Sequence, residues 1–132
     1  MTFARIIRPI VCLALLGLAV AGPAHAVEVG DVQEGDASYM ADSLHGNKTA
    51  SGEPYNKNAM TAAHRTLPFG TRVKVTYLKT GKSVELTIND RGPHKPANRI
   101  LDVSGAAAKA LGMVKDGHGA VKIEVVGKPP GN

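Results

Sequence analysis

The sequence predicts a small, mainly β-stranded domain that closes into a barrel. Two segments of alternating apolar residues, 73–77 and 84–88, flank a short turn, and a third alternating segment lies at 121–125. One short helix is predicted between the second and third segments, and glycine and proline separate the strands. Short strands with a single late helix favour a small closed barrel over a parallel α/β sheet.

The β-hairpin at 73–88 is the clearest element. Its apolar residues occupy alternate positions on each strand: Val73, Val75 and Tyr77, then Val84, Leu86 and Ile88. Lys79-Thr80-Gly81-Lys82 forms the turn, and polar residues such as Lys74 and Glu85 fill the intervening positions. We therefore expect one face of the hairpin in the core and the other in water.

The helix is bounded by a signal at each end. Ser104 is a typical N-cap, the segment 105–111 is rich in alanine, and Gly112 is a typical stop. These residues predict one short helix over 104–111, ahead of the late strand.

The N-terminus has the organisation of a secretory signal peptide. Arg5 and Arg8 precede an apolar run over 10–20, and Ala24-His25-Ala26 supplies the small residues that signal peptidase accepts. The run is shorter than the roughly 20 apolar residues of a membrane span. We expect cleavage after this tripeptide and a periplasmic or secreted protein without a transmembrane span. No lipid anchor is expected, because Cys12 lies well before the cleavage site.

Cleavage would remove 26 of the 132 residues and leave 106, enough for one compact domain. We expect a leader over 27–35, the barrel over 36–126 and a flexible tail over 127–132. The mature chain contains no cysteine, so packing and backbone pairing must stabilise it without disulfides. We expect it to be a monomer.

The charge of the mature chain is mildly positive. Two of the 16 basic residues lie in the signal peptide and all 11 acidic residues lie beyond it, which leaves a net charge of +3. This surplus fits weak attraction to an anionic polymer such as peptidoglycan, and it also fits ordinary solubility. Nucleic-acid binding is not expected, because the lysines are scattered and no basic stripe is interleaved with aromatic residues.

Three polar segments are candidates for a functional site. The segment 45–56 is rich in turn-forming residues and holds Glu53 between glycine and proline. Asn89-Asp90-Arg91-Gly92-Pro93 places a carboxylate where the hairpin ends, and 61–70 carries His64 at the end of a small-residue strand. Side chains at strand ends are rigidly held and suit a binding or catalytic site.

With a fourth segment, these motifs resemble the signatures of the RlpA-like lytic transglycosylase family. The motifs follow in order: Thr49-Ala50-Ser51-Gly52-Glu53, Thr61-Ala62-Ala63-His64-Arg65-Thr66-Leu67-Pro68-Phe69-Gly70, Asn89-Asp90-Arg91-Gly92-Pro93 and Ile100-Leu101-Asp102-Val103-Ser104. The resemblance covers roughly residues 36–126. It implies a six-stranded double-psi β-barrel with one or two short helices, a periplasmic or wall-facing location, and lytic cleavage of peptidoglycan glycan strands.

The resemblance also implies which residues form the site. Glu53, His64 and Asp90 would be the catalytic side chains, and no metal or cofactor would be needed. Further polar side chains are candidate substrate contacts: Ser38, Tyr39, Thr49, Ser51, Asn89 and Arg91. The first strand departs from the family pattern, since Tyr39-Met40-Ala41 stands where an aromatic residue, tyrosine and glycine are usual.

Two carboxylates fit the chemistry of breaking a glycosidic bond. A protonated carboxyl donates its proton to the departing oxygen, and a second, ionised carboxylate stabilises the cation-like sugar. In a lytic transglycosylase the attacking group is the 6-hydroxyl of muramic acid itself, which produces a 1,6-anhydro end. We assign the general acid to Asp90 and the second role, including deprotonation of the 6-hydroxyl, to Glu53; the two roles could be exchanged.

Each of these residues also has a structural interpretation. Asp90 could organise a turn, Glu53 could be a solvated loop acid, and His64 could complete a hydrogen-bond network. Asp102 is expected to serve the neighbouring helix start. The spacing of a zinc site is missing from the other histidines: His45, His94 and His118.

Other classes of function share such a barrel. A non-catalytic module of the expansin kind would bind and loosen wall polysaccharide without cutting it, and an inhibitor or partner protein would use the barrel as a scaffold. Fold alone does not separate these functions. The presence of both Glu53 and Asp90 favours the enzyme, whereas the mild basic surplus favours the binding module.

Overall fold

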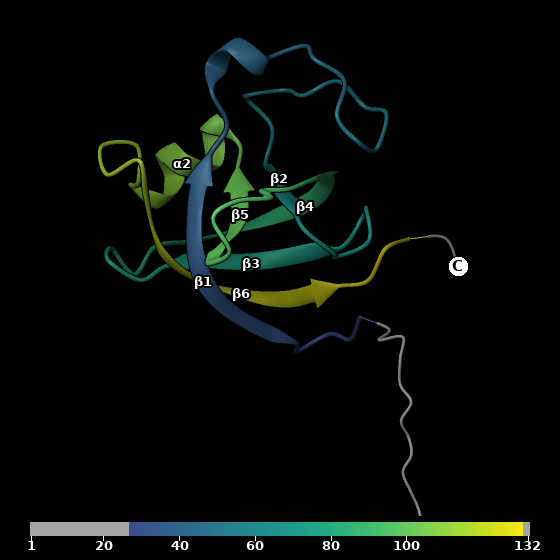
Figure 1. Cartoon of the computed structure of the whole chain (residues 1–132). Coiled ribbons are helices and arrows are strands. Elements are labelled where there is room, and N and C mark those ends of the chain that lie inside the picture. The colour runs from purple at the N-terminus through teal and green to yellow at the C-terminus, as the bar shows by residue number, and fades with distance from the viewer. Residues whose placement is uncertain (1–26, 131–132) are drawn as a thin grey trace, which may run out of the picture.

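The computed structural model describes residues 27–130 (Figure 1). Its elements, in chain order, are β1 (Val32–Tyr39), the 3-10 helix η3 (Asp42–Leu44), β2 (Thr61–His64), β3 (Arg72–Tyr77), β4 (Ser83–Arg91), β5 (Arg99–Val103), α2 (Gly105–Leu111) and β6 (His118–Gly127). The predicted signal peptide with its cleavage site, and the last two residues of the predicted tail, lie outside the described residues.

The six strands of the described chain form one closed barrel. Their order around the barrel is β1-β5-β2-β4-β3-β6. β1 runs parallel to β5 and β2 runs parallel to β4, while the other neighbouring strands are antiparallel. The prediction of a closed six-stranded barrel with short helices is confirmed.

The predicted hairpin forms β3 and β4. Val73 pairs with Leu86 and Val75 with Val84, and Gly81 in the turn has a φ of 76°. The alternate apolar side chains of these strands point into the barrel, where they meet those of β5 and β6. The barrel interior is filled by residues that are almost fully buried: Val73, Val75, Tyr77, Leu86, Ile88, Leu101, Val103, Val121, Ile123 and Val125.

The first strand begins at Val32, four residues before the predicted start of the barrel at Asp36. The predicted leader over 27–35 is therefore wrong for its last four residues, which pair with β6. Its sequence gives no strand signal because no residue before Ala37 is buried. At Gly35, a Cβ atom would lie 2.9 Å from the side chain of Ile100, so a larger residue would collide with the neighbouring strand.

The helix α2 has the ends that the sequence predicts. The Ser104 hydroxyl accepts the backbone N–H of Ala107, and Gly112 ends the helix in the left-handed region with a φ of 76°. Ala107, Ala108 and Leu111 are fully buried against the barrel. None of the helices among residues 27–130 has the length and apolar character required to cross a membrane.

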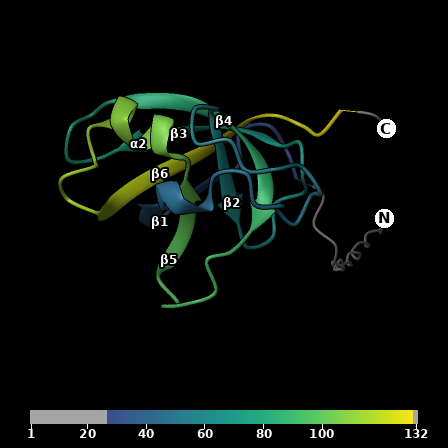
Figure 2. The ribbon, with the colours of Figure 1, turned by 90° about the horizontal axis from the view of Figure 1, so that it is seen from above.

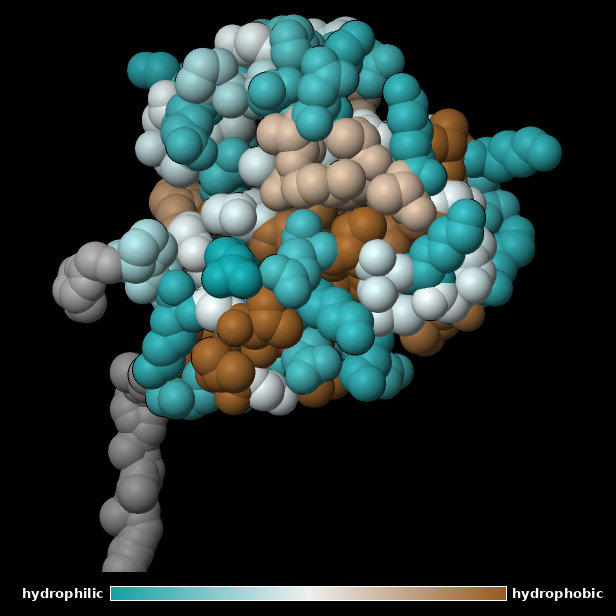
Figure 3. All heavy atoms as spheres, turned by 180° about the vertical axis from the view of Figure 1, so that it is seen from behind, coloured by the Kyte–Doolittle hydropathy of each residue, from teal (hydrophilic) through white to brown (hydrophobic). Residues whose placement is uncertain are grey.

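The long segment between β1 and β2 lies at one end of the barrel. Figure 1 shows it rising above the strands, and Figure 2, seen from above, shows it lying over the barrel. In Figure 3, polar residues dominate this end of the molecule, and apolar atoms are visible on the barrel wall below it. The segment contains the predicted loop 45–56, so its contacts with the strands decide where Glu53 lies.

Candidate active site

The loop 45–56 is bound to the end of β4. Ser51 donates its backbone N–H to the carbonyl oxygen of Asn89 over 3.3 Å, and Ala50 donates its backbone N–H to Asp90 Oδ1 over 2.9 Å. Asn89 Nδ2 donates to Glu53 Oε1 over 3.2 Å. The structure therefore brings Glu53 and Asp90 to the same end of the barrel, on two segments that touch at Asn89.

The loop is held in shape by its own backbone. Thr49 donates both its N–H and its hydroxyl to the carbonyl oxygen of Glu53, over 2.8 and 2.7 Å. Gly52, with a φ of 97°, makes the turn between them in a conformation that favours glycine. Tyr55 is 3% exposed and its hydroxyl accepts the N–H of Gly105, so the loop is also tied to the start of α2. Glu53 is exposed on a loop that is fixed at both of its ends.

An irregularity in β4 explains how two consecutive residues reach the loop. Ala62 of β2 pairs with Ile88, but the next residue, Ala63, pairs with Asp90, so Asn89 is an extra residue on β4. In a regular strand Asn89 and Asp90 would point to opposite faces. An extra residue of this kind bends the strand and redirects side chains. Here the side chains of both residues hydrogen-bond to the loop 45–56.

Asp90 is half-buried and its carboxyl group is fixed by backbone donors. Oδ1 accepts the N–H of Ala50 over 2.9 Å and the N–H of Arg91 over 2.8 Å. Within residues 27–130, Oδ2 accepts no hydrogen bond. The carboxyl group thus has a defined orientation with one oxygen left for a substrate.

His64 has both ring nitrogens occupied by protein groups. Nδ1 accepts the backbone N–H of Thr66 and of Leu67, each over 3.1 Å. The other nitrogen, Nε2, therefore carries the hydrogen, and it donates to Gln33 Oε1 over 2.8 Å. Burial lowers the pKa of His64 to about 4, and the positive charges of Arg91 and Arg65 act in the same direction. The ring is neutral at neutral pH.

The structure does not bring the His64 ring together with the two carboxylates. His64 lines a cavity of about 700 Å³ together with the core residues Ile123 and Val125. Its neighbour Ala63 belongs instead to a separate apolar cluster with Met40 and Tyr55, beneath the loop. Successive residues of a strand face opposite sides of the sheet, so the ring of His64 and the row that contains Asp90 lie on different sides.

Three of the candidate substrate contacts lie beside the carboxylates. Asn89 contacts Glu53 directly, and the Ser51 hydroxyl accepts the N–H of Glu53 over 3.4 Å. Thr49 is buried, and its hydroxyl lies 2.9 Å from that of Ser51. Of these three side chains, Ser51 is thus the one that is exposed enough to contact a ligand.

The other three candidates make contacts elsewhere. Ser38 of β1 donates its hydroxyl to Asp102 of β5, and the Tyr39 hydroxyl donates to the carbonyl oxygen of Val114 over 3.0 Å. The expected role of Asp102 at the helix start is replaced by this contact with Ser38. Arg91 donates to the carbonyl oxygens of His64, the last residue of β2, and Leu67, in the segment that follows; its guanidinium carbon lies 4.2 Å from the ring centre of Phe69.

A row of paired residues nevertheless connects Ser38 to Asp90. Ser38 pairs with Asp102, Asp102 with Ala63, and Ala63 with Asp90, across β1, β5, β2 and β4. Residues paired directly across a sheet point to the same face. Asp102 and Asp90 are therefore two strands, or about 10 Å, apart on one face of the barrel.

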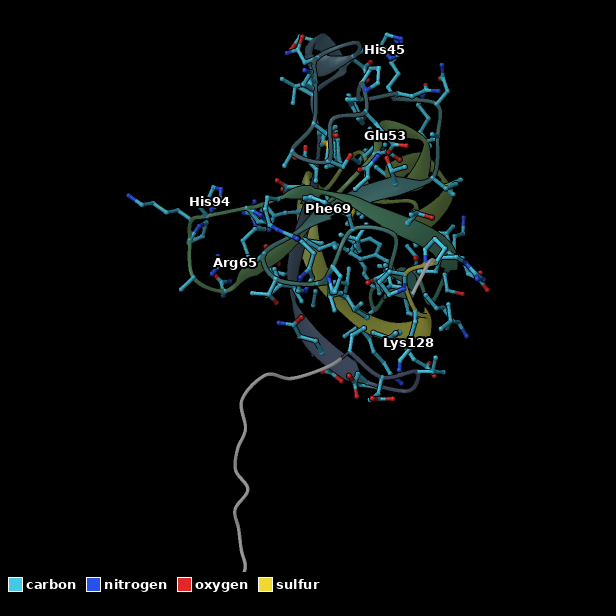
Figure 4. The ribbon with its side chains drawn as sticks, turned by 90° about the vertical axis from the view of Figure 1, so that its right-hand side faces the viewer. His45, Glu53, Arg65, Phe69, His94 and Lys128 are labelled. Atoms are coloured by element: carbon cyan, nitrogen blue, oxygen red, sulfur yellow. The ribbon has the colours of Figure 1, made fainter. Side chains whose placement is uncertain are left out.

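The sequence pattern does not identify the partners of these side chains. Gln33 has no distinguishing signal, and the motif marks Asn89 as a candidate substrate contact but not as the partner of Glu53. Each partner is selected by the fold rather than by its neighbours in the chain. Figure 4 shows Glu53 at the loop end of the barrel and Lys128 at the other end.

Residues 27–130 contain no group of three or more histidine, cysteine, aspartate or glutamate side chains that could hold a metal ion.

Comparison with known proteins identifies the family. The family described as "Lytic transglycolase" matches residues 33–123. A protein of Synechocystis sp. named "Probable endolytic peptidoglycan transglycosylase RlpA" is 50% identical over 101 residues, which cover 76% of this chain and 31% of that protein. The chain spans about a third of the length of the curated relatives it matches.

Two solved structures share the barrel. The Streptomyces papain inhibitor matches with a TM-score of 0.60 and 21% identity, over 76% of this chain and 99% of that chain. The apo expansin of Clavibacter michiganensis matches with a TM-score of 0.59 and 24% identity, over 76% of this chain and 53% of that chain. At these identities the likeness concerns the fold, and it confirms the double-psi β-barrel. The match over residues 33–123 and the 50% identity to a relative together show that the chain belongs to the lytic transglycolase family.

Proposed function

We propose that this protein is a peptidoglycan lytic transglycosylase that cleaves glycan strands and leaves 1,6-anhydro-muramic ends. The observation that carries the proposal is the placement of Glu53 and Asp90, which lie far apart in sequence and are both bound to the junction of the loop 45–56 with β4. The names of the relatives support the same activity, since they are called endolytic peptidoglycan transglycosylases. No metal or cofactor enters the proposed reaction.

In the proposed reaction Asp90 is the general acid. Its Oδ1 is fixed by two backbone N–H groups, so Oδ2 carries the proton and donates it to the glycosidic oxygen as the bond from that oxygen to C1 breaks. The 6-hydroxyl oxygen of the same muramic acid forms the new bond to C1, and its proton passes to Glu53. One proton is donated and one is taken up, so the two carboxyl groups end in exchanged protonation states.

His64 and Arg91 are positioning residues in this proposal. The Arg91 guanidinium donates to the carbonyl oxygens of His64 and Leu67, over 3.0 and 2.7 Å. The His64 ring accepts two N–H groups of the same turn. Together these contacts hold the end of β2 against the end of β4, where Asp90 immediately precedes Arg91. Ser51 is the proposed substrate contact beside the carboxylates, because Asn89 is buried beneath the loop.

The proposed location is the periplasm or the outside of the cell, reached through the cleavable signal peptide at residues 1–26. Peptidoglycan is found only beyond the cytoplasmic membrane, so the activity requires export. The signal-peptide pattern supports this location, and the absence of cysteine after Cys12 fits an oxidising compartment without a disulfide requirement.

The test is to incubate the protein from Val27 onward with purified sacculi and to analyse the released fragments by mass spectrometry. A lytic transglycosylase releases fragments one water lighter than those of a hydrolase, and borohydride does not reduce their ends. A muramidase run in parallel supplies the reducible fragments for comparison. Binding to sacculi without release of any fragment would instead favour the expansin-like binding module.

A further inference from the structure

Asn89 lies between the two carboxylate-bearing segments, and the two polar atoms of its side chain differ in their contacts. Its side chain is almost fully buried, with 7% of the residue exposed. Nδ2 donates to Glu53 Oε1 over 3.2 Å, whereas Oδ1 is buried and accepts no hydrogen bond from any residue in 27–130. Leaving a buried carbonyl oxygen without a donor is costly, and such groups are rare in folded proteins.

The backbone of Asn89 is fixed although its amide is not. Asn89 is the extra residue of β4 opposite Ala62 and Ala63, and its carbonyl oxygen accepts the N–H of Ser51 over 3.3 Å. The only group on Asn89 with a choice of orientation is therefore the side-chain amide. A half-turn of the amide exchanges Nδ2 and Oδ1, and in either orientation one of the two faces Glu53.

We propose that Asn89 is a positioning residue that serves Glu53 in both of its protonation states; this inference rests on the proposed function. When Glu53 is ionised, Nδ2 donates to its carboxylate, as in the structure. When Glu53 holds a proton, the turned amide presents Oδ1, which accepts the carboxyl O–H. Each orientation makes one hydrogen bond and leaves one amide group unpaired, so the protonation state of Glu53 selects between them.

The contrast with Asp90 assigns the proton acceptor. Asp90 Oδ1 is bound by the N–H groups of Ala50 and Arg91, and these can donate but cannot accept. Of the two carboxylates, only Glu53 has a side-chain partner, the amide of Asn89, that can both donate and accept a hydrogen bond. Glu53 is therefore the group that receives the 6-hydroxyl proton and returns it to water after each turnover. Two charged residues belong to the same junction: Asp90 on β4 accepts the N–H of Ala50, and Lys48 pairs with Pro54, the residue after Glu53.

Two substitutions separate the donor and acceptor roles. Asn89→Leu has a similar size but can neither donate nor accept, so kcat should fall about tenfold or more while KM and sacculus binding change less than about twofold. Asn89→Asp has the same shape but adds a like charge beside Glu53, so the acidic limb of the pH profile should move to higher pH by about one unit.

Thr71→Val is the matched control for these substitutions. Thr71 is fully buried in the same barrel, its hydroxyl donates to the carbonyl oxygen of Pro68 over 2.7 Å, and it contacts neither carboxylate. This variant reports the effect of losing a buried polar group without touching Glu53. It should keep the kcat and pH profile of the unaltered protein. Equal losses of kcat in Asn89→Leu and Thr71→Val, at equal melting temperatures, would overturn the proposal.

An NMR titration tests the coupling without any enzymatic activity. The side-chain amide resonances of Asn89 should shift with the same midpoint as the carboxyl carbon of Glu53, and this shift should vanish in Glu53→Gln. Asn89 resonances that stay constant while Glu53 titrates would overturn the inference, whatever the activity of the protein. Coupled resonances in a protein that releases no anhydro fragments would refute the proposed function and leave the pairing of Asn89 with Glu53 in place.

Discussion

Ala50 donates its backbone N–H to the carboxylate of Asp90 over 2.9 Å, although 40 residues separate the two in sequence. This hydrogen bond joins the loop that carries Glu53 to the strand end that carries Asp90. Because the donor is a backbone group, no substitution at position 50 except proline removes it. The hydrogen bond from the Ser51 N–H to the carbonyl oxygen of Asn89 is main chain on both sides, so one contact of the junction does not depend on the side chains at positions 53 and 90. A substitution at position 90 that keeps an acceptor oxygen also keeps the contact with Ala50.

Asp90→Asn should abolish the release of anhydro fragments and leave the fold intact. The amide oxygen of asparagine can still accept the two backbone N–H groups, but the amide cannot donate a carboxyl proton. We expect a loss of about a hundredfold or more in kcat, or roughly 3 kcal/mol of transition-state stabilisation. Fragment release, sacculus binding and melting temperature should be measured on the same preparation.

Asp31→Asn is the control for this substitution. Asp31 also accepts a backbone N–H, from Glu28 over 2.9 Å, but it lies at the start of the described chain rather than in the loop 45–56 or on β4. It should retain full activity. Full activity in Asp90→Asn would remove Asp90 from the mechanism.

Ser104→Ala should destabilise the domain without changing the site. The Ser104 hydroxyl accepts the N–H of Ala107 and donates to the carbonyl oxygen of Ala59 over 2.5 Å, in a fully buried position. Losing the helix cap and leaving the carbonyl oxygen unpaired should lower the free energy of unfolding by about 2 kcal/mol. Urea denaturation measures this change. Ser83→Ala, at the exposed start of β4, should change it by less than about 0.5 kcal/mol; equal effects would contradict the capping role.

The elements with local signals could be predicted from the sequence. The hairpin β3–β4 shows unbroken alternation of apolar residues, and α2 has Ser104 and Gly112 at its ends. The start of β1 could not be predicted, because its inward position at residue 35 is a glycine that makes room for Ile100. A close approach between strands leaves no periodic pattern in a single sequence.

The site could be predicted only at the level of single residues. The motifs identified Glu53 and Asp90, but their connection through Asn89 depends on an extra residue in β4 that appears only when β4 pairs with β2. The same limit applies to His64, whose partner Gln33 lies on β1, in a segment without a recognisable pattern. Contacts between distant segments are set by barrel closure, which local sequence does not encode.

The exported protein should begin at Val27 and carry no lipid. Ala24-His25-Ala26 provides the small residues required at a signal-peptidase site, and Cys12 lies within the segment that is removed. N-terminal sequencing and intact-mass measurement of the exported protein decide this. Cys12→Ser should leave export and mass unchanged. A diacylated product with Cys12 at its N-terminus would contradict the prediction.

The stability of the domain should fall as the pH falls from about 6.5 to about 4, because of His64. Burial lowers the pKa of His64 to about 4 in the folded protein, whereas an unfolded histidine has a value near 6.5. Between these values the unfolded chain binds a proton that the folded protein does not, so protonation favours unfolding. The contribution of the neutral ring is fully present above pH 6.5 and is lost progressively down to about pH 4.

The His64→Asn variant isolates this effect. Asparagine can still accept the N–H groups of Thr66 and Leu67 but does not titrate, so the unaltered protein should lose about 2 to 3 kcal/mol more than the variant between pH 7 and pH 4. Urea denaturation at a series of pH values measures the free energy of unfolding of both proteins. The titration of the carboxylates is common to both proteins and cancels in the difference. His94→Asn, at an exposed position between β4 and β5, should reproduce the pH dependence of the unaltered protein. If the difference between His64→Asn and the unaltered protein stays constant over this range, then the ring is not held neutral by the fold, and the hydrogen bonds that Nδ1 accepts from Thr66 and Leu67 are not the contacts that acid disrupts.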